Sequence, residues 1–303
     1  MKKVEFDTNM SFEIDNKLIE SLKEDERVIK FIKDNKLDIS IIDKFPYKFK
    51  NWINDLDICN LCDGLNYCKQ GHVGRYFDLK YDGVFSRVLV SCDYKIKDDK
   101  NREHLSNYYV NDLSESMKFI DFENIKIDNE DSRYLQVLSK VLDCLESKTY
   151  GLFIFGSIGS GKTYLAACAC NKLAKEGYKV SFVNLPLFSS RIKTMLENNE
   201  YQKEVDKLIE SDFLVIDDIG AESVTSWFRD EILFTIINER MENKKWTWFT
   251  SNEDFTSLKS HFEINNRNVK EKVKAERIMS RIKTLSKPLK LLGKDRRIIW
   301  FIQ

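Results

Sequence analysis

The sequence predicts an α/β protein in which a parallel sheet flanked by helices follows a small N-terminal α+β domain. Three observations predict this fold. From residue 151 onward, strand-like segments alternate with helix-like segments, which is typical of a parallel sheet with helices on both faces. A glycine-rich loop joins the first of these strands to the first of these helices. A cluster of cysteines between residues 59 and 92 precedes them and indicates a separate small domain.

The N-terminal third of the chain differs in pattern from the rest. Residues 10–35 show helical periodicity, and residues 84–90 form a strand-like apolar run. Residues 96–118 are polar and charged, which is typical of a linker. We therefore expect an N-terminal domain of residues 1–95, a linker of residues 96–118 and a second domain of residues 119–303.

The second domain is expected to begin with a helix over residues 131–146 and then to alternate. The predicted strands are 151–155, 179–184, 212–217 and 246–250. The predicted helices between them are 162–176, 187–210 and 224–242. A basic helix near 269–284 and a terminal strand pair, 289–292 and 296–302, close the chain.

The glycine-rich loop reads G-x-x-x-x-G-K-T and follows the apolar run 152–155. Strand, loop and helix in this order predict a phosphate-binding P-loop, in which backbone N–H groups and a helix N-terminus surround an anion. Lys162 can reach the β- and γ-phosphates of ATP, and Thr163 can offer its hydroxyl to Mg²⁺. The loop residues expected to bind the cofactor are Gly156, Ser157, Ile158, Gly159, Ser160, Gly161, Lys162 and Thr163.

A second acidic site lies about fifty residues after the P-loop. Residues 213–216 are a continuous apolar run, which suits a central parallel strand, and two carboxylates end it. Ligands of such sheets bind at the carboxyl ends of the strands, so these carboxylates should lie beside the P-loop. Asp217 is expected to hold Mg²⁺, directly or through water, and Asp218 to polarise the attacking water. Glu222 is a weaker candidate for the base and fits a loop or cap residue better.

Composition excludes few functions. Lys+Arg and Asp+Glu both number 49, so the net charge of zero predicts no partner. Residues 259–297 hold 13 Lys/Arg and 4 Asp/Glu, a net of +9, which could meet phosphates, line a subunit interface or form a solvated helix face. No apolar run approaches the roughly 20 residues of a membrane span, and the N-terminus lacks the apolar core of a signal peptide. We therefore expect a cytoplasmic protein without a membrane partner.

The cysteine cluster has the spacing of a metal site. A C-x₂-C pair can form a knuckle around one Zn²⁺, and two more ligands would complete a tetrahedron. Such a site would be structural, since four protein ligands leave no open position. One of the five candidates is surplus, and free cysteines in a small core are the alternative. The candidate ligands are Cys59, Cys62, Cys68, His72 and Cys92.

The order of motifs from residue 120 to the end resembles the bacterial helicase loaders of the AAA+ superfamily. Residues 122–124 (Phe-Glu-Asn) resemble the segment before their ATPase core, and residues 155–163 resemble their Walker A motif. Residues 215–222 (V-I-D-D-I-G-A-E) are similar to their Walker B segment, where Asp at the second acidic position is usual. Residues 226–231 and 249–252 also fit, whereas residues 244–248 are bulkier than is usual before the sensor strand.

The resemblance implies roles for further residues. Asn252 would be sensor I, a polar side chain beside the γ-phosphate. Arg281, helped by Arg277, would be an arginine finger that reaches the γ-phosphate bound by a neighbouring subunit. Arg296 or Arg297 would correspond to sensor II. The N-terminal cysteines extend the resemblance to the loaders that carry such a cluster, although the spacing from residue 68 to residue 72 is short.

The resemblance implies a slow ATPase, stimulated by its partner or by DNA, that helps to place a replicative helicase hexamer on single-stranded DNA. The N-terminal domain would bind the helicase, and the AAA+ domain would bind ATP, self-associate and contact DNA. Two alternatives remain at this stage. One is a transposition-helper ATPase that assembles on duplex DNA, and the other is a nucleotide-gated adaptor without significant hydrolysis.

Overall fold

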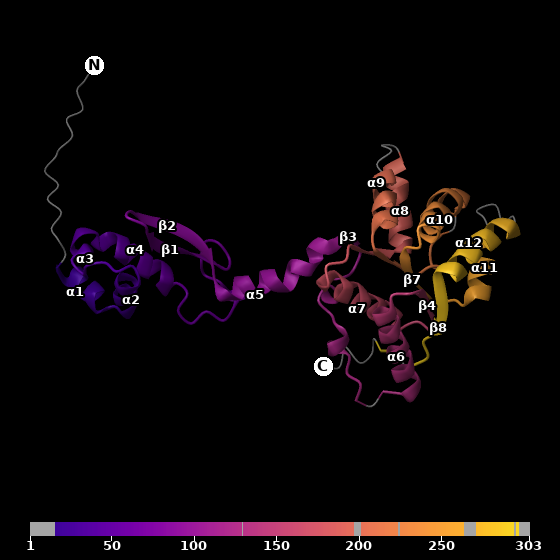
Figure 1. Cartoon of the computed structure of the whole chain (residues 1–303), viewed down its shortest axis with the longest axis horizontal. Helices are drawn as coiled ribbons and strands as arrows, with labels where there is room; N and C mark the ends of the chain where they lie inside the picture. Colours follow the sequence, from indigo (N-terminus) through magenta and orange to yellow (C-terminus); the bar gives the residue numbers. More distant parts are fainter. Residues whose placement is uncertain are drawn as a thin grey trace, which may run out of the picture. The chain divides into compact units, whose positions relative to one another are not determined.

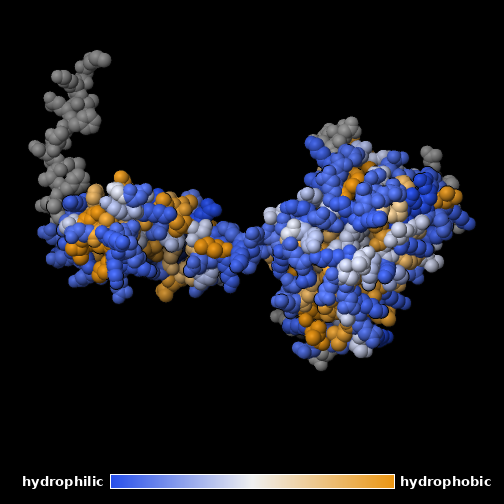
Figure 2. Space-filling view, viewed as in Figure 1, coloured by the Kyte–Doolittle hydropathy of each residue, from blue (hydrophilic) through white to orange (hydrophobic). Residues whose placement is uncertain are grey.

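The computed structural model describes residues 16–128, 130–196, 201–223, 225–263, 271–293 and 295–296. The chain forms two compact units, Met1–Lys100 and Asn101–Gln303 (Figure 1). No helix among the described residues is long and apolar enough to cross a membrane. Blue, hydrophilic residues dominate the visible surface of the larger unit, with smaller apolar areas between them (Figure 2).

In the described part of the first unit, helices α1 to α4 precede a two-stranded hairpin. The helices are α1 (Asn16–Glu24), α2 (Glu26–Asp34), α3 (Ile41–Lys44) and α4 (Pro46–Asp57), and the antiparallel strands are β1 (Arg75–Tyr81) and β2 (Phe85–Ser91). The helical periodicity of residues 10–35 resolves into two helices because the Asp25 side chain accepts the N–H of Arg27 and starts α2. Phe31, Phe49 and Phe85 pack in the core of this unit.

The stretch expected as a linker is ordered structure. Residues 96–118 include most of α5 (Asp93–Arg102), a 3₁₀ turn (Glu103–Asn107) and β3 (Tyr108–Asn111). β3 pairs in parallel with β5 (Val180–Asn184) as the edge strand of the large sheet. Within β3 only Val110 is buried, so this edge strand lacks the apolar run by which buried strands are recognised.

The second unit contains a six-stranded sheet in the order β3-β5-β6-β7-β4-β8. Every neighbouring pair is parallel, which confirms the predicted α/β architecture. The remaining strands are β4 (Gly151–Phe155), β6 (Phe213–Asp217), β7 (Trp246–Ser251) and β8 (Ser286–Lys290). Because β4, β7 and β6 are neighbours, the loops that leave their carboxyl ends meet at one edge of the sheet.

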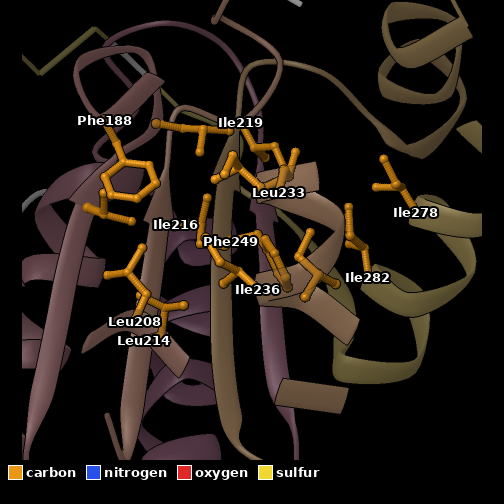
Figure 3. Packing of buried hydrophobic residues seen from close by; sticks show 14 of the residues in the cluster. Phe188, Leu208, Leu214, Ile216, Ile219, Leu233, Ile236, Phe249, Ile278 and Ile282 are labelled. Carbon is orange, nitrogen blue, oxygen red and sulfur yellow. The ribbon is translucent and has the colours of Figure 1, made fainter. Parts of the chain in front are cut away.

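Helices cover both faces of this sheet. One core packs α6 (Ser132–Ser147) and α7 (Lys162–Lys175) against one face. The other packs α8 (Leu185–Met195), α9 (Tyr201–Glu210), α10 (Phe234–Glu242), α11 (Phe255–Glu263) and α12 (Lys272–Leu285) against the opposite face. Successive residues of β6 alternate between the two cores, and Figure 3 shows Leu214 and Ile216 in the second of them.

Three predicted elements differ in their bounds. The helical region 187–210 is two helices, α8 and α9, and a π-helical turn (Phe228–Leu233) leads into α10. The strand expected at 289–292 is β8, which begins earlier, at Ser286. The strand expected at 296–302 lies almost wholly outside the described residues, which end at Arg296.

Candidate functional site

The P-loop joins the carboxyl end of β4 to the N-terminus of α7. Gly159 and Gly161 adopt φ angles of 79° and 101°, which favour glycine and let the loop turn its backbone inward. The N–H of Gly156 donates to the carbonyl of Ser251 at 3.3 Å, which fixes the start of the loop to the end of β7. Ile158 is exposed at the loop, whereas Ser160 is fully buried.

Lys162 points back into this loop. Its Nζ donates to the carbonyl oxygens of Gly156 at 3.0 Å and Ser157 at 2.9 Å, and to Oδ1 of Asn252 at 2.8 Å. Only 5% of the residue is exposed. The amine therefore lies inside the phosphate-binding loop and already contacts Asn252, the residue predicted as sensor I.

Asp217 ends β6 beside the P-loop and is 2% exposed. Burial, together with the nearby charge of Asp218, raises the pKa of this carboxyl to about 6. Hydrogen bonds from the side chains of Thr250, Thr163 and Asn184 lower the pKa of Asp217 and so offset part of that effect. The Thr250 hydroxyl lies 2.6 Å from Oδ1. A buried carboxylate next to the Thr163 hydroxyl is a donor set that suits Mg²⁺.

Asp218 directly follows β6 and has an unusual backbone conformation. Its φ angle of 57° is unusual for a residue other than glycine, and its N–H donates to Oγ1 of Thr250 at 3.0 Å. Thr250 thus orients both acidic residues at once. Sequence reasoning missed this threonine, although its place two residues before Asn252 on the sensor strand was a usable signal.

Glu222, the weaker candidate for the base, is held in the loop that follows β6. Its Oε2 accepts the N–H of Gly220 at 2.8 Å, and its Oε1 lies 3.5 Å from Nε2 of His261. The side chain of Glu222 is 1% exposed. These contacts agree with the alternative that Glu222 closes the loop rather than acts as the base.

The two predicted finger arginines lie together on α12. Both guanidinium groups stack on the Phe234 ring, at 4.7 Å for Arg277 and 4.6 Å for Arg281. Nε of Arg281 also donates to Oδ1 of Asn238 at 2.7 Å. Arg277 is exposed and Arg281 is half-buried, so α10 holds both arginines within the subunit.

Arg296 lies on the P-loop. Its backbone N–H donates to the carbonyl of Gly159 at 2.9 Å, and its guanidinium donates to the carbonyl of Ser160 at 3.1 Å. The guanidinium also pairs with Glu130 at 2.5 Å and lies 3.7 Å from the centre of the Tyr134 ring. The other sensor II candidate, Arg297, lies outside the described residues. No signal in the sequence pointed to Glu130 or Tyr134.

Four of the five candidate metal ligands lie around one cavity in the first unit. The cavity that they line has a volume of about 200 Å³. Backbone and amide donors face two of the sulfurs, with the N–H of Gly74 at 3.3 Å from Cys68 and the amide of Gln70 at 3.2 Å from Cys59. His72 does not line this cavity; its ring is exposed and lies edge-on to Phe77. The four cysteines that line it are Cys59, Cys62, Cys68 and Cys92.

The four cysteines share one cavity, but their side chains are not arranged as a metal site. Among the residues that the structure describes, no three His, Cys, Asp or Glu side chains are close enough to hold a metal ion. The shared cavity and the N–H groups that face the sulfurs are nevertheless compatible with thiolate ligands. Sulfur ligands suit Zn²⁺ in their chemistry, but the described residues do not form a metal site. Cys92, and not His72, lines the cavity with the other three cysteines.

Comparison with known proteins places these features in context. The family model of IstB-like ATP-binding proteins matches residues 82–283. The replicative helicase loader DnaI of Bacillus subtilis is 31% identical over 293 residues, which cover 93% of this chain and 94% of that protein. The replicative helicase loader DnaC of Escherichia coli is 30% identical over 142 residues, or 45% of this chain and 57% of that protein.

Solved structures show the same likeness. A crystal structure of DnaI matches 62% of this chain and 98% of that chain, with a TM-score of 0.54 and 28% identity. A putative primosome component from Streptococcus pyogenes matches 65% of this chain and 100% of that chain, with a TM-score of 0.53 and 26% identity.

Proposed function

The chain belongs to the family of DnaI-type replicative helicase loaders, and from this premise we propose that it uses ATP to place a replicative helicase hexamer on single-stranded DNA. One observation carries the proposal: the similarity to DnaI of Bacillus subtilis extends over 93% of the chain, so it includes the first unit as well as the ATP-binding unit. A loader of this kind works where the chromosome is, so we place the protein in the cytoplasm.

The residues at the carboxyl ends of the strands would have separate roles in ATP hydrolysis. Lys162 would exchange its contacts with the loop carbonyls for the β- and γ-phosphates. Asn252, which Lys162 would release, could then face the γ-phosphate or the attacking water. Asp218 would orient that water, because its backbone is held by Thr250.

Mg²⁺ would be held by Thr163 and Asp217, and it would supply positive charge for the phosphates. Burial raises the pKa of the Asp217 carboxyl, and a bound cation would stabilise its charged form. Arg296 would act as sensor II, because it already reaches the P-loop carbonyl of Ser160.

Self-association would complete the site. The contacts of Arg277 and Arg281 with Phe234 hold both guanidinium groups on the surface of α10 and α12. We propose that this surface meets the ATP site of a neighbouring subunit and that Arg281 stabilises the transferred phosphoryl group there. Hydrolysis would then be slow in the isolated subunit and faster in the complex with helicase or DNA.

The first unit would bind the helicase and carry a structural zinc ion. Cys59, Cys62, Cys68 and Cys92 would hold the metal, because these four share one cavity. Four protein ligands leave no position for a substrate, so the ion would serve only to stabilise this small unit.

The basic stretch 259–297 would contribute to the surface that contacts single-stranded DNA. The basic stretch 259–297 is partly neutralised, because Lys259 pairs with Glu276 and Lys274 pairs with Asp230. These ion pairs favour a folded helix surface over a strip of unpaired positive charge, and the remaining lysines would contribute to DNA binding through phosphate contacts.

The decisive experiment mixes the protein with a replicative helicase hexamer and measures the mass of the product with and without ATP. A loader forms a defined complex that transfers helicase to single-stranded DNA. Complex formation with a transposase instead of the helicase would identify a transposition helper. Single-turnover measurements in the presence of DNA separate the third possibility, since a nucleotide-gated adaptor binds ATP without cleaving it.

A further inference from the structure

Three buried polar atoms near the loops after β6 and β7 have no hydrogen-bond partner among the described residues. They are Oε1 of Glu222, Oε2 of Glu253 and Nε2 of His261. Nε2 of His261 lies 3.5 Å from Oε1 of Glu222, which is an ion-pair distance rather than a hydrogen bond of ordinary length. Buried polar atoms are seldom left unpaired, so this cluster requires an explanation.

The cluster joins the two loops that carry the hydrolysis residues. Glu222 lies four residues after Asp218, and Glu253 directly follows Asn252. A Cβ placed on Gly220 would lie 3.4 Å from Oε2 of Glu253, so the second carboxylate reaches the first loop.

Ser251 links the same two loops by hydrogen bonds. Its hydroxyl donates to the carbonyl of Ile219 at 2.6 Å and accepts the N–H of Glu253 at 3.1 Å. The two loops are therefore in direct contact through the Ser251 side chain.

Protonated His261 would neutralise one of the two carboxylate charges in this cluster. The carboxylate of Glu222 belongs to the loop after β6, and that of Glu253 belongs to the loop after β7. The Glu222 side chain is almost fully buried. An unpaired carboxylate in such a place is strongly unfavourable, whereas an imidazolium compensates it. In agreement, the neighbouring Glu222 carboxylate raises the pKa of His261, with a smaller contribution from Glu253.

We propose that His261 is a positioning residue for ATP hydrolysis: its imidazolium holds Glu222 and Glu253 together and thereby fixes the loops of Asp218 and Asn252. The inference rests on the proposed ATPase function and names a residue that acts on that same site. His261 belongs to α11, which packs against α12, so the helix that carries the finger arginines adjoins the one that carries this histidine.

Other charged groups near the cluster are already compensated or belong to the same helix. Lys259 of α11 pairs with Glu276 of α12, and Glu263 lies two residues beyond His261. The groups that act on the His261 imidazole are therefore Glu222, from the loop after β6, and Glu253, from the loop after β7.

The proposal has a consequence for the pH dependence of the reaction. As the pH rises through the pKa of His261, the imidazolium is lost and the two carboxylates repel each other. The kcat for ATP should fall on this alkaline side, while the affinity for ATP should hardly change because Lys162 and the P-loop are untouched.

The test compares three forms of the full chain in the presence of helicase and single-stranded DNA. His261→Gln removes the charge, and His261→Arg keeps a charge at every pH. We expect His261→Gln to lower kcat about tenfold at neutral pH with ATP affinity within about twofold of the parent. His261→Arg should retain more activity than His261→Gln and lose the alkaline fall in kcat. Parental kcat and pH profile in His261→Gln would overturn the proposal.

A second measurement does not depend on hydrolysis. The chain has three histidines, so the His261 imidazole can be followed by NMR during a pH titration. We expect a pKa above the ordinary value that falls in Glu222→Gln. If Glu222→Gln leaves the titration unchanged, the inference is wrong even where the protein is an active ATPase. If the parent protein never hydrolyses ATP while this titration behaves as expected, the proposed ATPase function fails, and the positioning role fails with it.

Discussion

The ammonium of Lys162 lies 2.8 Å from the amide oxygen of Asn252, so the P-loop lysine and the proposed sensor I residue bind each other directly. The two side chains are 90 residues apart in sequence and come from α7 and from the end of β7. A phosphate that replaces the amide oxygen on Lys162 would release Asn252. ATP binding is thereby linked to the position of the residue that would report the γ-phosphate.

This contact predicts opposite effects on ATP binding for substitutions of Lys162 and of Asn252. Lys162→Ala should abolish ATP binding, because it removes the positive charge that meets the β- and γ-phosphates. Asn252→Ala should leave ATP binding equal to or tighter than that of the parent, because Lys162 loses a competing partner, and should lower the rate of hydrolysis.

A fluorescent ATP analogue measures the affinity, and single-turnover kinetics measure the chemistry. Lys172→Ala, at the exposed end of α7, is the matched control and should resemble the parent. Loss of ATP binding in Asn252→Ala would show that the amide holds the lysine in place rather than competes for it.

A second prediction concerns the cost of burying Asp217. Its pKa of about 6 exceeds the ordinary value, so between pH 4 and pH 6 the folded protein holds a proton that the unfolded chain has lost. The free energy of unfolding of the nucleotide-free protein should therefore fall as the pH rises through this window. Asp217→Asn removes this charge and should raise the stability at pH 7.5 on the order of 2 kcal/mol, while Mg²⁺-dependent ATP binding is weakened.

Thermal and denaturant unfolding at pH 4.5 and pH 7.5, without nucleotide or Mg²⁺, measure the effect. The exposed α6 carboxylate of Asp143 provides the control, and Asp143→Asn should leave the stability unchanged at both values. A lower stability of Asp217→Asn at pH 7.5 would mean that the hydrogen bond from Thr250 outweighs the buried charge.

The sequence predicts those parts of the site that are encoded in short contiguous segments, and it does not predict contacts between residues far apart in the chain. The P-loop and the strand that ends in Asp217 were predictable, because buried parallel strands are continuous apolar runs and the P-loop needs glycines at fixed positions. β3 was not, because an edge strand with only Val110 buried has no such run. The pair Arg296–Glu130 joins residues 166 positions apart, and only the folded chain brings them together.

A third prediction tests that pair. Arg296 links the P-loop carbonyl of Ser160 to Glu130 while stacked on Tyr134. Arg296→Ala should weaken ATP binding about tenfold, because it removes a guanidinium with charge-assisted hydrogen bonds. Glu130→Gln should have a smaller effect, and Arg296→Lys should not restore the affinity, since an ammonium lacks the planar fork.

Arg133→Ala is the control for this series, because Arg133 forms an exposed ion pair with Asp131 close to the same segment. Isothermal titration with ATP and with ADP measures the affinities. Parental affinities in Arg296→Ala would assign sensor II to another residue.

A fourth prediction concerns the metal. Protein purified without chelator should contain about one Zn²⁺ per chain, and removal of the metal should unfold the first unit without emptying the ATP site. Cys92→Ser should lose the metal and His72→Ala should keep it, because Cys92 lines the cysteine cavity and His72 does not.

Elemental analysis measures the metal content, and circular dichroism with an ATP-binding assay follows the two units. If the purified protein contains no zinc, the cysteines of the cluster are free thiols. Loss of zinc in His72→Ala but not in Cys92→Ser would show that His72, and not Cys92, is the fourth ligand.

The last prediction separates a finger that acts between subunits from a brace within one. If Arg281 completes the ATP site of a neighbour, Arg281→Ala should bind ATP nearly as the parent does, yet fail to form ATP-dependent oligomers and lose hydrolysis by a factor of roughly 10³–10⁵. Mixing it with Lys162→Ala should restore part of the turnover, because mixed interfaces pair an intact P-loop with an intact finger. Asn238→Ala supplies the control, since it removes only the partner of the Arg281 Nε and leaves the guanidinium free to reach a neighbour. A brace predicts instead that Arg281→Ala and Asn238→Ala lower the melting temperature alike and that no mixture recovers activity. Analytical ultracentrifugation with ATP and steady-state hydrolysis of the mixtures distinguish these outcomes.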